Sequence, residues 1–320
     1  MESNVKRKNI IKFIAMPCIA ILIICFGASF FMLHYALTPQ HRGLNIEESY
    51  TEMYNRYPFL KQWVDSLNQE KALKDTVLIN KEGKKLHAFY IDAPQPTSKT
   101  AIIVHGYTDN AIRMFMIGYL YNRDLAYNVL LPDLQFHGKS EGKAIQMGWK
   151  DRLDIMEWID LAIQKYGSST SLVVHGISMG AATTMMLSGE EQPAHVKCYI
   201  EDCGYTSVWD EFSQEINVRF SLPSFPLIPL TSWLCQQIYG WSFDEASALN
   251  AVKKCKEPML FIHGDEDTFV PTWMVYPLFE AKSEPKELWI VPGVEHAKSY
   301  LYFKEEYTQR VANFLSTHME

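Results

Sequence analysis

Residues 172–184 read LVVHGISMGAATT, and two regular elements meet within this stretch at a very short turn. Leu172 and the valines after it are typical of a buried strand, whereas the small residues beyond the turn favour a helix. Gly176 and Gly180 flank the turn, at positions where a side chain would collide with neighbouring backbone. A turn of this kind exposes a hydroxyl at the N-terminus of the helix, so Ser178 is a candidate nucleophile.

Short apolar runs alternate with amphipathic stretches on both sides of this turn. The runs that indicate strands are residues 77–80, 86–91, 100–105, 128–131, 172–175, 198–201, 259–263 and 288–291. The stretches that indicate helices are residues 112–123, 149–166, 179–188, 273–281 and 305–318. The inner strands are almost continuously apolar, as expected where helices cover both faces of a sheet. The pattern predicts an α/β fold with a mostly parallel, eight-stranded sheet and flanking helices.

The beginning of the chain differs from the rest, because residues 13–33 carry no charged side chain. This stretch is long enough to cross a bilayer core as a helix, at about 1.5 Å of rise per residue. Basic residues precede it at Lys6, Arg7, Lys8 and Lys12. Such residues favour the cytoplasmic side, so we expect an uncleaved anchor that leaves the remaining chain outside the cytoplasm. A cleaved signal peptide, which would give a secreted or periplasmic protein, is the alternative.

The sequence suggests an anchor or signal peptide at residues 1–37, a connecting arm at 38–75 and an α/β domain at 76–320. Residues 204–256 form an interval much longer than a strand–helix crossover needs, and prolines interrupt it. We expect a helical cap here, inserted after the sixth strand and lying over the C-terminal edge of the sheet.

The cap interval is rich in aromatic residues. Three of them are candidates for contact with a substrate: Trp209, Phe212 and Trp233. These aromatic side chains could equally form the small core of the cap itself. Both interpretations place an apolar layer above the edge of the sheet where Ser178 is expected.

Residues 105–108 read HGYT and follow a predicted strand directly. Gly106 lets the loop turn sharply and aim a backbone N–H at the site. The backbone N–H groups of Tyr107 and Met179 are therefore candidate donors to an oxyanion. On its own, the segment could also be an ordinary glycine turn.

Residues 263–271 read HGDEDTFVP, again directly after a predicted strand. One of the three acids is expected to orient a histidine. Asp267 matches a Gly-x-x-Asp-x-x-Val-Pro spacing, and Asp265 is the alternative. The acids without that role, Glu266 among them, would be loop acids or would supply negative charge to a helix N-terminus.

Residues 293–297 read GVEHA and follow the last predicted strand. His296 is the histidine that lies in this loop, downstream of both Ser178 and Asp267. Three other histidines adjoin motif glycines at strand ends, where packing or loop hydrogen bonds explain them: His105, His175 and His263. The order of nucleophile, acid and histidine along the chain predicts a Ser-His-Asp triad.

These motifs resemble those of the α/β-hydrolase superfamily, from about residue 76 to the C-terminus. Residues 132–142, PDLQFHGKSEG, look like the D-x-x-x-H-G-x-S-x-G loop of the serine aminopeptidase and monoacylglycerol-lipase-like branch. That branch often has Arg-Gly where this chain has Gln135 and Phe136. With its N-terminal anchor, the chain is similar to membrane-anchored or exported bacterial α/β-hydrolases. The resemblance implies the fold and the mechanism but hardly constrains the substrate.

The formal net charge of −7 argues against nucleic acid as a partner. An acidic domain has no attraction to anionic lipid, so the helix must supply any tether to the membrane. Four of the six cysteines lie outside the apolar stretch and lack paired C-x-x-C spacing. We expect free thiols, with a disulfide between Cys235 and Cys255 as the alternative in an oxidising compartment. Acids and histidines occur at triad spacing rather than in a ligand cluster, so no metal and no organic cofactor is expected.

The combined motifs predict a serine hydrolase that cleaves a small acyl ester, as a carboxylesterase or lipase does, through an acyl-enzyme. An aminopeptidase or amidase is the second hypothesis, and it would need an acidic pocket for a free amine. The acids of the cap that could form such a pocket are Asp210, Glu211, Glu215, Asp244 and Glu245. Acyl transfer to an acceptor other than water and a non-catalytic binding protein on the same fold are further alternatives.

Overall fold

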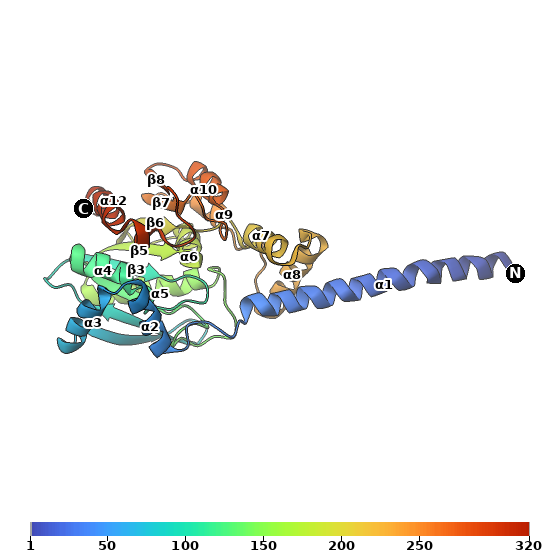
Figure 1. The fold of residues 1–320 in the computed structure, drawn as a ribbon, viewed down its shortest axis with the longest axis horizontal. Helices are drawn as coiled ribbons and strands as arrows, with labels where there is room; N and C mark the ends of the chain where they lie inside the picture. Colours follow the sequence, from blue (N-terminus) through green and yellow to red (C-terminus); the bar gives the residue numbers. More distant parts are fainter. Residues whose placement is uncertain (1, 320) are drawn as a thin grey trace.

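The computed structural model describes residues 2–319, and its centre is a sheet of eight strands (Figure 1). The strands are β1 (Leu73–Ile79), β2 (Lys85–Ile91), β3 (Lys99–Val104), β4 (Asn128–Pro132), β5 (Ser171–Ile177), β6 (Val196–Asp202), β7 (Met259–Gly264) and β8 (Lys286–Val291). Their order across the sheet is β1-β2-β4-β3-β5-β6-β7-β8. β2 pairs antiparallel with both β1 and β4, and all other neighbours are parallel. The predicted α/β fold with a mostly parallel sheet is confirmed.

Helices cover both faces of the sheet. Alternate residues of each inner strand point to opposite faces, so each inner strand contributes side chains to two apolar cores. On β3, Ile102 and Val104 belong to one apolar core, and Ala101 and Ile103 belong to the other. The first core is covered by α5 (Asp151–Tyr166), α6 (Met179–Ser188) and α10 (Val275–Ala281). The second is covered by α2 (Ile46–Arg56), α3 (Leu60–Gln69), α4 (Phe115–Tyr119), α11 (Ser299–Tyr302) and α12 (Lys304–His318).

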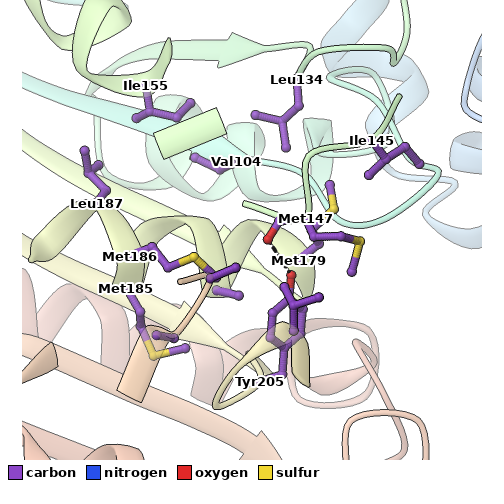
Figure 2. Packing of buried hydrophobic residues seen from close by; sticks show 14 of the residues in the cluster. Val104, Leu134, Ile145, Met147, Ile155, Met179, Met185, Met186, Leu187 and Tyr205 are labelled. Carbon is purple, nitrogen blue, oxygen red and sulfur yellow. Dashed lines mark hydrogen bonds between the residues drawn. The ribbon is translucent and has the colours of Figure 1, made fainter. Parts of the chain in front are cut away.

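Part of the first core includes Met179, the residue after the candidate nucleophile (Figure 2). Val104 from the end of β3 and Ile155 from α5 belong to this cluster with the methionines of α6. The Tyr205 hydroxyl donates a hydrogen bond of 2.9 Å to the Met147 carbonyl oxygen, which ties two loops together here. The apolar packing and this hydrogen bond hold the N-terminal end of α6 in place.

Two element boundaries differ from the sequence-based expectation. β1 begins at Leu73 rather than at residue 77, because β2 offers backbone partners along its whole length, with Leu73 opposite Ile91. The predicted helix 112–123 is shorter, since α4 begins at Phe115 and continues as a π-helical turn. The first residues of the predicted helix form a turn instead. In this turn the Asn110 side-chain oxygen accepts hydrogen bonds from the N–H groups of Ile112 and Arg113.

The connecting arm packs against the sheet through α2 and α3. The Asn45 side-chain oxygen accepts from the Glu48 N–H at 3.2 Å, which satisfies a free donor at the start of α2. Trp63 of α3 is buried, and its ring lies edge-on to those of Phe115 and Tyr119. The arm thus contributes side chains to the second core.

The cap interval between β6 and β7 is helical. It contains α7 (Val208–Phe220), α8 (Ser224–Tyr239) and α9 (Ala248–Val252). The Ser207 hydroxyl accepts from the Asp210 N–H at 3.0 Å and so caps the start of α7. Phe225 has extended backbone angles and kinks the first turn of α8. The cap has apolar contacts of its own, with the rings of Phe212 and Phe243 edge to face at 4.9 Å.

The first helix, α1 (Glu2–Leu37), extends far from the body of the molecule, with the N-terminus at its distant end (Figure 1). Met16–Leu37 has a mean hydropathy of 2.4 and is long and apolar enough to span a membrane or to be a signal sequence. The last part of α1 lies beside α8 of the cap (Figure 1). There the buried Ser29 hydroxyl donates a hydrogen bond of 3.2 Å to the Leu227 carbonyl oxygen.

The four cysteines outside α1 are buried free thiols. They are Cys198, Cys203, Cys235 and Cys255. The alternative of a disulfide between Cys235 and Cys255 is therefore wrong for this structure, in which both serve as small apolar core residues.

The position of Trp63 predicts that the arm is part of the folded unit. Truncation of Trp63 to alanine should lower the free energy of unfolding by about 3 kcal/mol, because a buried aromatic ring leaves a cavity. Gln62→Ala, on the exposed side of the same helix, is the control and should stay within about 0.5 kcal/mol of the wild type. Urea unfolding of both variants measures the difference, and equal stabilities would show that the arm folds separately.

Candidate active site

The turn between β5 and α6 holds Ser178 in a backbone conformation that is rare for a residue with a side chain. Its φ is 58° and its ψ is −120°. A Cβ at Gly176 would lie 2.0 Å from the Gly180 carbonyl oxygen, and one at Gly180 would lie 2.0 Å from the Val104 carbonyl oxygen. No side chain fits at either position, so both glycines are required for the turn to form.

Ser178, His296 and Asp267 come from three different loops and meet in one chain of hydrogen bonds. The distance from His296 Nε2 to Ser178 Oγ is 2.8 Å, and that from His296 Nδ1 to Asp267 Oδ2 is 2.6 Å. Asp267 is fully buried at its side chain, whereas His296 keeps 20% of its side chain exposed. The structure thus brings together the three residues that the sequence order indicated, with the serine facing an accessible imidazole.

The surroundings of Asp267 favour its ionised form. Burial alone would raise its pKa, but hydrogen bonds with His263 and His296 outweigh burial and leave the pKa below the ordinary value. Its second oxygen, Oδ1, accepts from the N–H groups of Phe269 and Val270, each at 3.0 Å. A buried carboxylate that accepts three hydrogen bonds, with His263 Nε2 also 3.4 Å away, holds a fixed direction toward the imidazole.

The alternative acid, Asp265, lies elsewhere in the loop. It is exposed, and its Oδ1 accepts a hydrogen bond of 2.6 Å from the Gly293 N–H. Glu266 is exposed as well. Asp265 therefore joins the two loops that carry Asp267 and His296 and does not itself touch the imidazole.

Two backbone N–H groups border the space in front of the serine. The loop after β3 passes close to the nucleophile, since a Cβ at Gly106 would lie 3.3 Å from Ser178 Cβ. Tyr107 follows in this loop, and within residues 2–319 no backbone carbonyl accepts from its N–H. Met179 is the first residue of α6, where N–H groups have no acceptor within the helix. Both candidate oxyanion donors are thus available to a ligand.

The other motif histidines are buried and hydrogen-bonded. His105 Nε2 accepts from the Leu134 N–H at 2.9 Å, and His175 lies between two tyrosine hydroxyls. His263 does more than the sequence suggested. Its Nε2 donates to the Val270 carbonyl oxygen at 2.9 Å and lies 3.4 Å from Asp267 Oδ2. It therefore helps to hold Asp267, the candidate acid, which its position at the end of a strand did not reveal.

Cys203 is a further neighbour of the triad. Its sulfur, a carboxylate oxygen of Asp267 and a ring nitrogen of His296 lie within 4.8 Å of one another. Burial raises the pKa of the Cys203 thiol well above its ordinary value, and nearby carboxylates add to the shift. A protonated thiol is a poor metal ligand, and Asp267 and His296 already bond to each other. The donor set fits a triad better than a metal centre.

A cavity of about 580 Å³ opens in front of Ser178. Its walls come from the end of α1, from α7 and α8 of the cap and from the loop after β7. Of the three aromatic residues predicted to contact substrate, Phe212 lies in the wall. Trp209 packs against the first core, and Trp233 is exposed beside Phe26, so neither lines this cavity in the described part of the chain.

Two features of the cavity were not apparent from the sequence. The end of α1, with Phe31 and Tyr35, forms one wall, although this stretch was assigned to the anchor. Glu211 of α7 lines the cavity as a buried carboxyl, and within residues 2–319 its Oε2 has no hydrogen-bond partner. Burial raises the pKa of Glu211 well above its ordinary value, with a further contribution from Glu215. The sequence offered Glu211 only as one of five acids in the cap.

The sheet order, the strained serine turn and the loops that bring acid and histidine to it define an α/β-hydrolase. The sequence profile of the prolyl oligopeptidase family, peptidase family S9, matches residues 135–320, and the chain belongs to this family.

Several known proteins are similar to the chain. The Bacillus subtilis protein YqkD is 32% identical, over 71% of this chain and 74% of its own length. The Schizosaccharomyces pombe protein bem46 is 24% identical, over 96% of this chain and 94% of its own. The solved structure of the Pyrococcus furiosus esterase Pf2001 has a TM-score of 0.63 and 26% identity, covering 78% of this chain and 93% of the esterase.

A buried acid behind the site predicts how stability depends on pH. Burial raises the pKa of Glu201 to about 8, and within residues 2–319 its Oε1 has no hydrogen-bond partner. Between the ordinary pKa of about 4.3 and this value, the folded state binds more protons than the unfolded state. Stability should therefore fall as pH rises through this window.

Glu201→Gln should weaken that fall, because the amide does not titrate and can still accept from the Gly204 N–H. Urea unfolding of the wild type and the variant at pH 5 and pH 8 measures the effect. An identical loss of stability in both proteins would show that Glu201 does not cause the pH dependence.

Proposed function

We propose that the chain is a serine ester hydrolase that works through an acyl-enzyme on Ser178. The observation that carries the proposal is the chain of hydrogen bonds from Ser178 Oγ through the His296 imidazole to the Asp267 carboxylate. A serine hydroxyl needs a base within hydrogen-bond reach to act as a nucleophile, and His296 meets that requirement.

In the proposed reaction, His296 Nε2 removes the proton from Ser178 as Oγ attacks the acyl carbonyl. Asp267 holds Nδ1 protonated and stabilises the imidazolium that forms. The N–H groups of Tyr107 and Met179 bind the oxyanion. His296 then protonates the departing alcohol as the ester C–O bond breaks. Water, deprotonated by His296, attacks the acyl-enzyme and releases the acid.

An ester of a hydrophobic acid fits the cavity best. Its walls are largely apolar, with Phe212, Ile216 and Ile228 from the cap among them. The similarity to the Pyrococcus furiosus esterase supports the same reaction class. An apolar cavity binds an acyl chain by removing its surface from water, which amounts to about 0.8 kcal/mol per buried methylene group.

Amide cleavage is the second candidate, and Glu211 is the observation that favours it. A carboxyl group in the cavity wall could bind the free amine of an aminoacyl substrate, and the family is named for a peptidase. The burial that raises the pKa of Glu211 argues in the other direction, because it favours the neutral carboxyl, which attracts an ammonium group less than a carboxylate does. Ester cleavage therefore remains the leading proposal.

We further propose that α1 is retained as an anchor, with the catalytic domain outside the cytoplasm. Lys6, Arg7 and Lys8 precede the apolar stretch, in the arrangement that favours the cytoplasmic side. Leu33 and Leu37 are buried in the first core, so cleavage of α1 would expose part of the folded domain. These contacts support an uncleaved helix over a removed signal peptide.

The triad assignment predicts the activity of three variants on p-nitrophenyl esters. Ser178→Ala should abolish turnover and labelling by a fluorophosphonate, and Asp267→Asn should lower kcat by about 10⁴-fold through the wrong imidazole tautomer. Asp265→Asn is the matched control and should retain most of the activity, because Asp265 does not touch His296. Circular dichroism confirms folding of each variant. Full activity of folded Ser178→Ala would refute the proposal.

Glu211→Gln separates ester from amide cleavage. For an esterase, kcat/KM on p-nitrophenyl esters should change little, because glutamine resembles the neutral carboxyl in shape and charge. For an aminopeptidase, kcat/KM on aminoacyl-arylamides should fall sharply, because the carboxylate that binds the amine is gone. Parallel assays of the wild type and the variant on both substrate sets distinguish the two outcomes.

A further inference from the structure

The rim of the catalytic cavity has an apolar side and a polar side. Some residues line the cavity and are exposed at the same time, so they mark its mouth. The apolar ones are Phe31 and Tyr35 of α1 and Phe220 of α7, and the rings of Tyr35 and Phe220 meet edge to face at 6.0 Å. The polar ones are His34, Gln40, His41 and Arg219. A mouth of this kind matches an amphiphilic ligand, whose acyl chain would lie on the apolar side and whose headgroup would lie on the polar side.

The anchor meets the cap before it can have crossed a bilayer. The last charged residue before the apolar stretch is Lys12, and the ring of Phe26 already contacts Trp233 of α8 at 6.5 Å. A helix from Lys12 to Phe26 is about 21 Å long at about 1.5 Å per residue. The hydrocarbon core is about 30 Å thick. If Lys12 lies at the near surface, the contact with the cap falls inside the lipid, and any tilt of the helix places it deeper.

The part of the cap beside α1 has the composition that such a location requires. Residues 220–243 contain no Asp, Glu, Lys, Arg or His. Large apolar side chains are nevertheless exposed there, with Phe225 77% and Trp233 52% accessible. Leu222 and Ile238 are exposed in the same segment. Exposed apolar residues without charges among them are costly in water and typical of a surface that enters a membrane.

The exposed face of α1 continues this surface. Along the last turns of α1, residues three or four apart are covered by the cap and the core, among them Ser29, Leu33 and Leu37. Phe26, one turn before Ser29, and Phe30, directly after it, remain exposed. The exposed residues of α1 and of residues 220–243 therefore form one uncharged surface that reaches the apolar side of the cavity mouth.

We propose that the cap lies in the lipid leaflet on the side of the catalytic domain and that the cavity receives the acyl chain of a membrane lipid ester laterally, alongside the paired rings of Tyr35 and Phe220. This substrate class rests on the proposed esterase function. The lipid headgroup lies at the polar rim near His41 and Arg219. Ser178 Oγ bonds to the acyl carbon as the C–O bond to the headgroup alcohol breaks, His296 protonates that alcohol, and water releases the fatty acid.

The first experiment tests immersion of the cap with the full-length protein in vesicles of phosphatidylcholine and phosphatidylglycerol. Trp233 is the reporter, through quenching of tryptophan fluorescence by lipids brominated on their acyl chains. Quenching should be weaker in Trp233→Phe than in the wild type, because Trp233 lies against the acyl chains. Equal quenching in both proteins would overturn immersion of the cap, whether or not the protein is an esterase.

The second experiment tests the substrate class. Phe225→Asp places a charge in the lipid-facing segment, outside the cavity wall, and should lower turnover of a long-chain glycerol monoester in the same vesicles by about tenfold or more. Turnover of soluble p-nitrophenyl butyrate should not change. Ile79→Asp on β1, a residue that is 63% exposed, is the matched control and should leave both rates unchanged. An unchanged long-chain rate in Phe225→Asp would overturn the proposal.

A third comparison distinguishes lateral access from access through water. The enzyme and a non-exchanging diacyl ester are placed in one bilayer, or the ester is placed in separate, enzyme-free vesicles. Lateral access predicts turnover in the shared bilayer and little in the separate vesicles, whereas equal rates would refute it. Loss of all turnover, including that of p-nitrophenyl butyrate, would instead refute the esterase function, and the quenching result would still decide the location of the cap.

Discussion

The site depends on the close approach of two backbone segments, the start of α6 and the end of β3. Gly180 makes this contact possible, since any side chain there would collide with the Val104 carbonyl oxygen. The same approach brings the loop after β3, in which Tyr107 follows Gly106, against Ser178, and Met179 begins α6 directly after the serine. A positive φ such as that of Ser178 persists where the surrounding structure holds it, and the buried residues of α6 belong to the first core. The order of the site therefore follows from the packing of the sheet.

Most of this arrangement was predictable from the sequence, because each member of the site follows a strand with a clear apolar signal. Parallel strands end at one edge of the sheet, so Ser178, Asp267 and His296 had to meet there once the strands were assigned. The choice between Asp267 and Asp265 followed from their spacing, and the hydrogen bonds of the two loops agree with it. Local chain geometry determines features of this kind.

Other features depend on contacts between distant segments, which periodicity and spacing do not encode. The proximity of His263 to Asp267 depends on how the loop after β7 curls back, and the burial of Glu211 depends on where the cap lies. The end of α1 in the cavity wall was the least predictable, because an apolar helix suited to lipid and one suited to packing have the same composition. Ser29 is the one hydroxyl residue of the apolar stretch 13–33, and its bond to the cap appears only in the structure.

The helix α1 is apolar enough to span a membrane, and its end also lines the cavity. Removal of α1 would therefore change the cavity as well. A chain cut after Leu37 would keep its nucleophile, histidine and acid but would lose Phe31, Met32 and Tyr35 from the cavity. What remained would be an open groove, with buried cap residues such as Ile228 left uncovered. The exposed apolar residues of such a fragment would make it prone to aggregate. The last turns of α1 thus combine an apolar composition that suits a membrane with a wall of the cavity, so a substitution there affects both properties.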